Sequence, residues 1–381
     1  MERIANQNQG ISFPVGYFPF NKNKVFNYQL NRWHSLGFLP KTEIEKVSLK
    51  IKTFNDWKLA MDHLGDKAEQ EKRFLNAAFY RRAAEFYLTD DLERKERYYD
   101  IFVDLFNNAI GSNESLKDCV PYDGGNLYSI QFKANGIKKG TLLIHGGFDS
   151  FLEEWYFIMK SFAGMGYDVI GFEGPGQGGV LLKQGIPLDY QWEKPVSAIL
   201  NYYNINEASI MGLSMGGWFC LRAAAFEPRI KNVIASGHAV DYSHIPPAFA
   251  RMVMMFFIKY FRTYTAKSFK KVSQKEGIQG WQTSQLAHIT KRPPLEAFEY
   301  SLNLNKENLH CERITQNVLY LTGKNDHFIP FKMHDLQIKL LTNVNSLTDR
   351  VYTKEEHADN HCQIGNISLM IKDCFTWLNS R

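Results

Sequence analysis

The stretch Gly212-Leu213-Ser214-Met215-Gly216-Gly217 decides the fold of this chain of 381 residues. A Gly-x-Ser-x-Gly run between an apolar strand and a helix is typical of a nucleophile elbow, a tight turn that exposes a serine hydroxyl. Residues 208–211 precede it as a predicted strand, and residues 218–225 follow it as a predicted helix. The flanking positions must be glycine because a side chain there would collide with the neighbouring strand or helix. We therefore expect Ser214 in a turn that points a helix N-terminus at a developing oxyanion.

The composition indicates a globular protein with two domains, or one large domain with additions. Hydrophobic residues make up 44% of the chain and aromatic residues 14%, which is ample for a packed core. The net charge of +5 is small, and basic residues are interspersed with acidic ones, so we expect no nucleic-acid partner. The five cysteines are scattered and form no C-x-x-C motif, so we expect neither a metal site nor a cofactor.

The opening residues, the apolar runs and the cysteines of the chain predict a cytoplasmic protein. The opening residues Met1-Glu2-Arg3-Ile4-Ala5-Asn6-Gln7 contain no apolar run of the kind found in secretory signals. The most apolar run, residues 252–258, is too short to span a bilayer, so we expect no membrane partner. The five cysteines are scattered and odd in number, which does not suggest a disulfide framework and fits a reducing compartment.

Residues 1–117 predict an N-terminal helical domain. Phe79, Ala83 and Phe86 recur at helical spacing, and a second amphipathic helix is predicted over residues 92–109. We interpret the charges at Arg81-Arg82 and in the run 94–97 as a solvated helix face.

Residues 118–381 predict an α/β domain with a mostly parallel central sheet. Short apolar segments that alternate with helical stretches predict strands at residues 127–132, 141–144, 167–172, 208–211, 231–235 and 317–321. Ligands of such sheets bind beyond the C-terminal ends of the strands. The Met- and Phe-rich interval of about 241–305 lacks a clear strand and predicts a helical lid.

A serine nucleophile needs a base and a carboxylate that orients the base, and both are present in the expected chain order. Asp326 follows the predicted strand 317–321, where a loop carboxylate can reach a histidine. His361 and His357 compete for the role of base. We favour His361 because it lies on the loop that enters the predicted last helix, and we interpret His357 as a surface or supporting residue.

The oxyanion donors are expected to be backbone N–H groups. One is that of Met215, directly after the serine, and the other lies in the turn of Gly147 and Phe148. We interpret His145 as a residue that holds this turn in place. Asp149 either hydrogen-bonds a substrate hydroxyl or caps a helix.

The substrate-binding residues are predicted around these groups. The loop Glu173-Gly174-Pro175-Gly176-Gln177-Gly178 does not match the dinucleotide motif G-x-G-x-x-G, so we expect it to shape the mouth of the site. The apolar stretch at residues 252–261 suits a flat aromatic substrate or packs on the core as a lid. The side chains expected to contact substrate are Asp149, Glu173, Trp218, Met254 and Phe257.

With these motifs placed, the chain resembles the α/β-hydrolase superfamily over residues 70–381. It is most similar to the branch with an N-terminal helical domain, which includes 2,6-dihydropseudooxynicotine hydrolase and FrsA-like esterases. It also resembles the C–C hydrolases that shorten polyketides in fungal pigment and bacterial anthraquinone biosynthesis. The resemblance implies a Ser-His-Asp triad at Ser214, His361 and Asp326. The first 60 residues carry no motif of this family.

The resemblance implies retro-Claisen cleavage of a poly-β-ketone or aromatic diketone, a small molecule that is free or carried by a carrier protein. Members of this branch often form dimers, so a homodimer is also expected. Direct attack by water, with Ser214 orienting the substrate, stays open. Two rival interpretations are a carboxylesterase that uses the same triad and a non-catalytic binding protein.

Overall fold

The computed structural model describes residues 12–89, 91–112 and 116–381, and the expectation about residues 1–7 lies outside this part. The helices of the N-terminal region are α1 (Lys24–Ser35), α2 (Lys41–Ser48), α3 (Phe54–Gln70), α4 (Phe74–Phe86) and α5 (Leu92–Ile110). The later α-helices are α6 (Tyr156–Gly164), α7 (Gly178–Gln184), α8 (Glu193–Tyr202), α9 (Met215–Phe226), α10 (Ala248–Tyr260), α11 (Arg262–Ser273), α12 (Ile278–Thr290), α13 (Pro294–Ser301), α14 (Lys306–Leu309), α15 (Lys332–Leu340) and α16 (Ile367–Leu378). Short 3₁₀ turns are η1 (Leu152–Trp155), η2 (Tyr242–His244), η3 (Cys311–Arg313) and η4 (His361–Gln363).

Eight strands form one sheet in the order β1-β2-β4-β3-β5-β6-β7-β8. The strands are β1 (Asp118–Tyr122), β2 (Gly125–Phe132), β3 (Gly140–His145), β4 (Tyr167–Glu173), β5 (Ala208–Leu213), β6 (Ile230–Ser236), β7 (Asn317–Gly323) and β8 (Ser346–Tyr352). Strands β4 to β8 and β3 pair in parallel, whereas β2 is antiparallel to both β1 and β4. The predicted mostly parallel sheet is confirmed, with β1 and β8 added at its edges.

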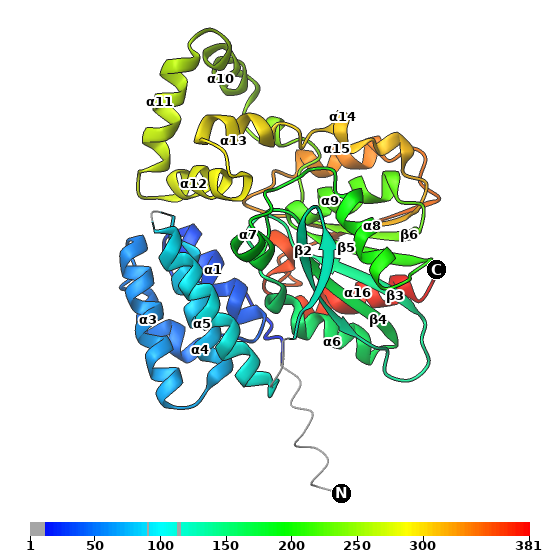
Figure 1. Cartoon of the computed structure of the whole chain (residues 1–381), viewed down its shortest axis with the longest axis horizontal. Helices are drawn as coiled ribbons and strands as arrows, with labels where there is room; N and C mark the ends of the chain where they lie inside the picture. Colours follow the sequence, from blue (N-terminus) through cyan, green and yellow to red (C-terminus); the bar gives the residue numbers. More distant parts are fainter. Residues whose placement is uncertain (1–11, 90, 113–115) are drawn as a thin grey trace, which may run out of the picture.

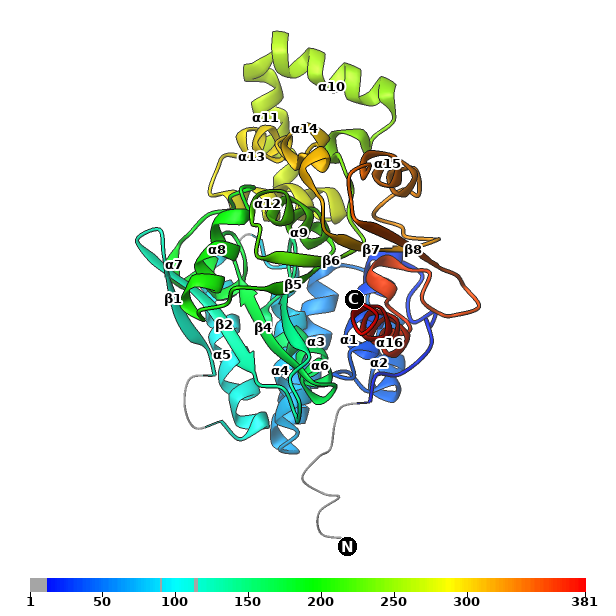
Figure 2. The same cartoon turned by 90° about the vertical axis from the view of Figure 1, so that its right-hand side faces the viewer.

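The two faces of the sheet are covered by different helices (Figures 1 and 2). Helix α9 packs on β5 and β6 on one face, and α6 packs on β4 on the other, next to α16. Side chains alternate between the faces, as a strand requires: Leu142 and Ile144 lie in one hydrophobic cluster and Leu143 in the other. The parallel strands β3, β5 and β7 therefore present their C-terminal loops along one edge of the sheet.

The N-terminal helices share a hydrophobic cluster with this sheet. Residues of α1, α3, α4 and α5 belong to the same buried cluster as residues of α6 and α16. The core is thus continuous from the helical region into the α/β region, and the division at residue 117 stays a proposal. Among the described residues, no helix combines the length and the apolar character that crossing a bilayer requires.

Candidate active site

The elbow holds Ser214 in a conformation that L-residues rarely adopt. Ser214 has φ of +60° and ψ of −132° between the end of β5 and the start of α9. Its backbone N–H donates to the carbonyl of Ser236 at 2.9 Å. A Cβ on Gly212 would lie 1.9 Å from the carbonyl oxygen of Gly216, so the turn closes only with glycine at position 212. The glycines predicted around the serine are therefore required by the local geometry.

Ser214, His361 and Asp326 form a continuous hydrogen-bonded chain. His361 Nε2 lies 2.9 Å from Ser214 Oγ, and His361 Nδ1 lies 2.6 Å from Asp326 Oδ2. His361 begins η4, and Asp326 lies in the loop after β7, so the three groups come from three separate loops. His357 is exposed, and no hydrogen bond joins it to Ser214 in the described residues. The structure brings together the three predicted side chains, and their catalytic roles stay a prediction.

The surroundings of His361 favour its protonated form. Burial acts to lower the pKa of His361, but the adjacent Asp326 carboxylate outweighs burial, so this pKa lies well above its ordinary value. The second oxygen of Asp326 accepts hydrogen bonds from the backbone N–H groups of Phe328 and Ile329, at 2.8 and 2.9 Å. The carboxylate is thereby held in one orientation, with Oδ2 directed at the imidazole.

The loop after β3 lies against the elbow. A Cβ on Gly147 would lie 2.7 Å from the backbone nitrogen of Met215, so only glycine permits this approach. Within the described residues, the N–H groups of Met215 and Phe148 have no hydrogen-bond acceptor. Two unpaired donors next to a serine hydroxyl are what an oxyanion hole supplies. Their use by a substrate stays a prediction.

Two groups that the sequence analysis missed hold this loop. Gln177 Nε2 donates to the carbonyls of Gly146 and Gly147, each at 2.9 Å. Arg82, on α4, donates through Nη2 to the carbonyl of Asp149.

His145 is fully buried, and its ring nitrogen Nδ1 lies 3.0 Å from the Gly146 carbonyl, which confirms its predicted structural role. Burial lowers the pKa of His145 to about 4, so the ring stays neutral near pH 7.

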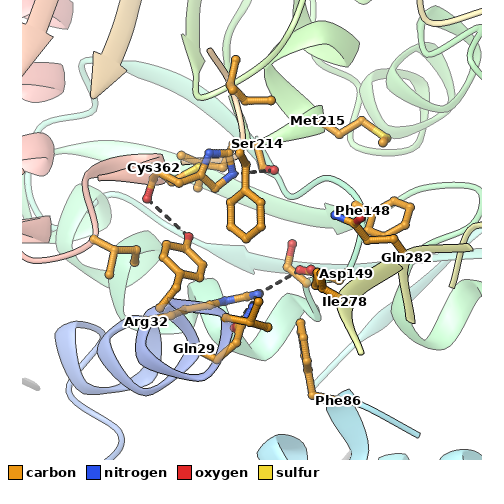
Figure 3. A pocket seen from close by; sticks show the side chains of 18 of the residues that line it. Gln29, Arg32, Phe86, Phe148, Asp149, Ser214, Met215, Ile278, Gln282 and Cys362 are labelled. Carbon is orange, nitrogen blue, oxygen red and sulfur yellow. Dashed lines mark hydrogen bonds and ion pairs between the residues drawn. The ribbon is translucent and has the colours of Figure 1, made fainter. Parts of the chain in front are cut away.

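A cavity of about 380 Å³ opens beside Ser214. Figure 3 shows Ser214 and Met215 on one side of it and Gln29 and Arg32, from α1, on the other. Helix α12 contributes Trp281 to the wall. Most of the lining side chains are apolar, so the cavity suits a largely hydrophobic ligand with a few fixed polar groups.

Four of the predicted substrate contacts do not line this cavity, so that part of the prediction is wrong. Trp218 is fully buried in the core below α9, and its indole N–H donates to the carbonyl of Val240. Met254 and Phe257 lie on α10, outside the wall of the cavity. Glu173 is buried and accepts hydrogen bonds from backbone N–H groups at the starts of η1 and α7, so it joins these two segments.

Asp149 and Phe148 do line the cavity. Asp149 Oδ1 accepts a hydrogen bond from Arg32 Nη1 at 2.9 Å, and about a quarter of the Asp149 side chain is exposed. The nearest helical turn, η1, has Phe151 at its N-cap position, so Asp149 caps no helix there. Of its two predicted roles, contact with a substrate hydroxyl is the one that stays open.

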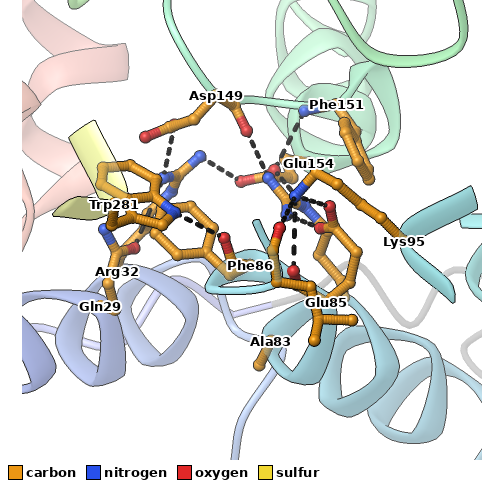
Figure 4. Close-up of polar contacts among 12 residues, drawn as sticks. Gln29, Arg32, Ala83, Glu85, Phe86, Lys95, Asp149, Phe151, Glu154 and Trp281 are labelled. Carbon is orange, nitrogen blue, oxygen red and sulfur yellow. Dashed lines mark hydrogen bonds and ion pairs between the residues drawn. The ribbon is translucent and has the colours of Figure 1, made fainter. Parts of the chain in front are cut away.

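A buried ion-pair network joins the N-terminal helices to this loop (Figure 4). Arg32 Nη2 lies 2.6 Å from Glu154, and Arg82 Nε lies 3.1 Å from the same carboxylate. Glu85 pairs with both Arg82 and Lys95. The prediction that Arg82 and Lys95 form a solvated face is therefore wrong, because partners from distant segments compensate the burial of their charges.

Helix α1 was the largest omission of the sequence analysis. Tyr28, Gln29 and Arg32 line the cavity, and the Tyr28 hydroxyl donates to the backbone carbonyl of His361 at 3.3 Å. Every residue of α1 from Phe26 to Ser35 is buried, polar ones included. A run of buried polar residues has no periodic signature, so the sequence offers no signal for it. In the described part of the chain, His, Cys, Asp and Glu side chains do not gather in groups that could hold a metal ion.

Comparison with known proteins agrees with this architecture. Residues 142–274 match the family model described as alpha/beta hydrolase fold. The chain is 32% identical over 199 residues to alpha/beta hydrolase psoB of Aspergillus fumigatus, which covers 45% of this chain and 44% of the relative. It is 30% identical over 212 residues to hydrolase acrC of Aspergillus aculeatus, covering 46% of this chain and 48% of the relative. The matched segments thus span about half the length of these curated relatives.

Two solved structures share the fold over almost the whole chain. One is the 2,6-dihydroxy-pseudo-oxynicotine hydrolase, with a TM-score of 0.65 and 18% identity over 92% of this chain and 94% of the other. The second is AbyA5, with a TM-score of 0.67 and 20% identity over 94% of this chain and 95% of the other. The sequence-based resemblance is confirmed at the level of fold, and the chain has the α/β-hydrolase fold.

Proposed function

We propose that this protein is a serine hydrolase that cleaves a carbon–carbon bond of a poly-β-ketone or aromatic diketone. The observation that carries the proposal is the hydrogen-bonded chain of Ser214, His361 and Asp326 beside a mostly apolar cavity. A general base, an orienting carboxylate and two unpaired N–H donors are the parts that nucleophilic acyl chemistry needs. The resemblance of the sequence to polyketide-shortening enzymes supports a ketone as the substrate class.

The first half-reaction forms an acyl-enzyme. His361 Nε2 takes the proton of Ser214 as Oγ attacks a ketone carbonyl, and the N–H groups of Met215 and Phe148 hold the oxyanion. The tetrahedral intermediate collapses, and the C–C bond breaks with its electron pair moving to the departing carbon as an enolate. Protonated His361 then gives its proton to this fragment, which leaves as a ketone.

The second half-reaction releases the acid. His361, again neutral, removes a proton from water, and the hydroxide attacks the acyl carbonyl. The collapse of this intermediate returns the proton to Ser214 and frees a carboxylic acid. The net reaction consumes one water per diketone and yields one ketone and one acid, with no change of redox state.

The division of the chain follows from this role. We propose that residues 118–381 carry the reacting groups, while residues 1–117 and the lid of about 241–305 enclose the substrate. Gln29 and Arg32 from α1 and Trp281 from α12 support this division because they line the cavity from outside the sheet. The proposed enzyme acts in the cytoplasm, which fits the free thiols among its described cysteines.

The test compares two substrate classes on the same protein. Purified enzyme is incubated with an aryl β-diketone and, separately, with p-nitrophenyl acetate, and the acid products are quantified by liquid chromatography and mass spectrometry. We expect diketone cleavage that Ser214→Ala abolishes. Rapid ester hydrolysis with an inert panel of diketones would instead make the protein a carboxylesterase. No turnover of either class by folded protein would favour a binding role.

A further inference from the structure

Gln29 brings an unused hydrogen-bond donor to the wall of the cavity. It lies in the middle of α1, is only 4% exposed, and lines the cavity on the side opposite Ser214 (Figure 3). Gln29 Oε1 accepts a hydrogen bond from Arg32 Nη1 at 3.4 Å, and this bond fixes which way the amide points. Over residues 12–89, 91–112 and 116–381, no acceptor pairs with the amide nitrogen Nε2. A buried donor without a partner is costly, so a ligand that supplies an acceptor gains affinity there.

The same arginine holds a free acceptor close to this donor. Arg32 Nη1 also donates to Asp149 Oδ1 at 2.9 Å, so one nitrogen joins the amide and the carboxylate (Figure 4). The ion pair of Arg32 Nη2 with Glu154, at 2.6 Å, keeps the guanidinium in place. Asp149 Oδ2 has no donor among the described residues, and the Asp149 side chain is 23% exposed. One arginine therefore supports an unpaired donor and an unpaired acceptor at the same end of the cavity.

We propose that Gln29 and Asp149 form a subsite for a neutral hydroxyl group on the aromatic end of the substrate. A phenolic hydroxyl accepts one hydrogen bond and donates another, so its oxygen accepts from Gln29 Nε2 and its O–H donates to Asp149 Oδ2. A carboxylate by itself would accept from any donor, so the amide from α1 is what makes the subsite selective for a hydroxyl. The inference rests on the proposed function, because the ligand is taken to be the ketone substrate.

The charges around the subsite favour a neutral group over an anion. Three cations and three carboxylates pair with one another in the network behind it: Arg32, Arg82 and Lys95 with Asp149, Glu154 and Glu85. Each positive charge is thus already matched by a negative one. Asp149 is the most exposed member of the network, so an anionic ligand group would meet a like charge first. Such a contact is unfavourable, whereas a hydroxyl brings no charge to the site.

The test measures binding by calorimetry to the full-length protein. The ligands are 2-acetonaphthone, its derivatives with one hydroxyl on the second ring, and 6-acetyl-2-naphthoate. We expect the hydroxy ketone whose hydroxyl reaches the subsite to bind about 10²-fold more tightly than the parent ketone, because the parent leaves both polar groups unpaired. The naphthoate is expected to bind no more tightly than the parent.

Two variants remove the donor. Gln29→Met keeps the length of the side chain and is expected to lower the preference for the hydroxyl by about 10-fold. Gln29→Glu keeps the bond to Arg32 but cannot donate, so it is expected to lower the preference at least as much. In both variants the parent ketone is expected to bind as it does to the wild type, which reports an intact cavity. The matched control is Gln282→Met, at an amide that lines the same cavity from α12, and it is expected to keep the preference.

Three results would overturn the proposal. The first is a wild-type protein that binds no hydroxy ketone more tightly than the parent. The second is a preference that both Gln29 variants retain or that Gln282→Met removes, and the third is a naphthoate that binds more tightly than the hydroxy ketones. None of these ligands is a β-diketone, so binding is read without turnover. Inert diketones together with an intact hydroxyl preference would reject the proposed reaction and leave the subsite standing.

Discussion

Replacement of Gly147 by alanine is expected to disable the oxyanion hole while leaving the triad in place. The added Cβ would lie 2.7 Å from the Met215 nitrogen and 2.8 Å from the Gly216 nitrogen. Both atoms are backbone in the first turn of α9, so they have little freedom to move. The loop that carries Phe148 must therefore retreat instead.

The size of the displacement follows from the contact distances. Ordinary contact begins at 3.4 Å, so the loop must retreat by about 0.7 Å to relieve a 2.7 Å approach. An oxyanion donor acts over the narrow distance range of a hydrogen bond, and loss of one donor reduces turnover by about 10²–10³-fold. We expect Gly147→Ala to lower the rate of reaction at Ser214 by this factor. A reagent that labels residues outside the site should react with the variant almost as it does with the wild type.

The assay is the rate of labelling by a fluorophosphonate probe, whose phosphoryl oxygen occupies the position of the oxyanion. The matched control is Gly164→Ala in α6, where an added Cβ meets no atom within 4 Å. The control is expected to label at the wild-type rate, and both variants are expected to unfold cooperatively. A Gly147→Ala protein that labels within about threefold of wild type would refute the assignment, since about 10²-fold is expected.

Three further perturbations follow from the charges of the site. Asp326→Asn is expected to slow labelling of Ser214 by about 10⁴-fold. The Asp326 carboxylate raises the pKa of His361, and the neutral imidazole is the base, so the low-pH limb of the pH–rate profile is expected to move to lower pH in this variant. A pH–rate profile measures both effects. Arg82→Met takes one of the two cationic partners from each of the buried carboxylates Glu85 and Glu154, and it is expected to lower the free energy of unfolding by about 3–5 kcal/mol in urea, whereas exposed Arg97→Met changes it by less than about 0.5 kcal/mol. Burial lowers the pKa of His238 to about 4, so the unfolded chain binds a proton that the folded chain does not. Stability is expected to fall below pH 6.5 by up to about 1.4 kcal/mol per pH unit from this residue, and His238→Gln removes that slope in urea titrations at several pH values; a slope that His238→Gln leaves unchanged would contradict the assignment.

The elbow could be predicted from sequence because its determinants are local. The turn needs glycine at fixed distances from one serine, and the collision between position 212 and the Gly216 carbonyl shows why. The parallel strands could also be predicted from the sequence, since each is a short apolar run that stays buried on both faces. Strand β8 could not be predicted in this way, because most of its residues are only half-buried at the edge of the sheet and few of them are apolar.

The cavity wall could not be predicted because it depends on contacts between distant segments. Arg82 was taken for a solvated residue, yet it pairs with Glu154, 72 positions later in the chain. Gln29 and Arg32 face the cavity from a helix without any recognisable motif. Phe257 was expected to contact substrate because it is apolar and lies in the lid, but it is not among the residues that line the cavity, and the helical pair of α10 and α11 projects away from the sheet (Figure 1). Composition identifies an apolar helix and does not identify what it packs against.

The most direct test of the proposed mechanism is to ask which histidine activates Ser214. Intact-mass and peptide mapping of fluorophosphonate-treated protein is expected to show one adduct, on Ser214, that His361→Gln slows by several orders of magnitude and His357→Gln leaves unchanged. A folded wild-type protein without this adduct, or a His361→Gln variant that labels as fast as wild type, would contradict the account.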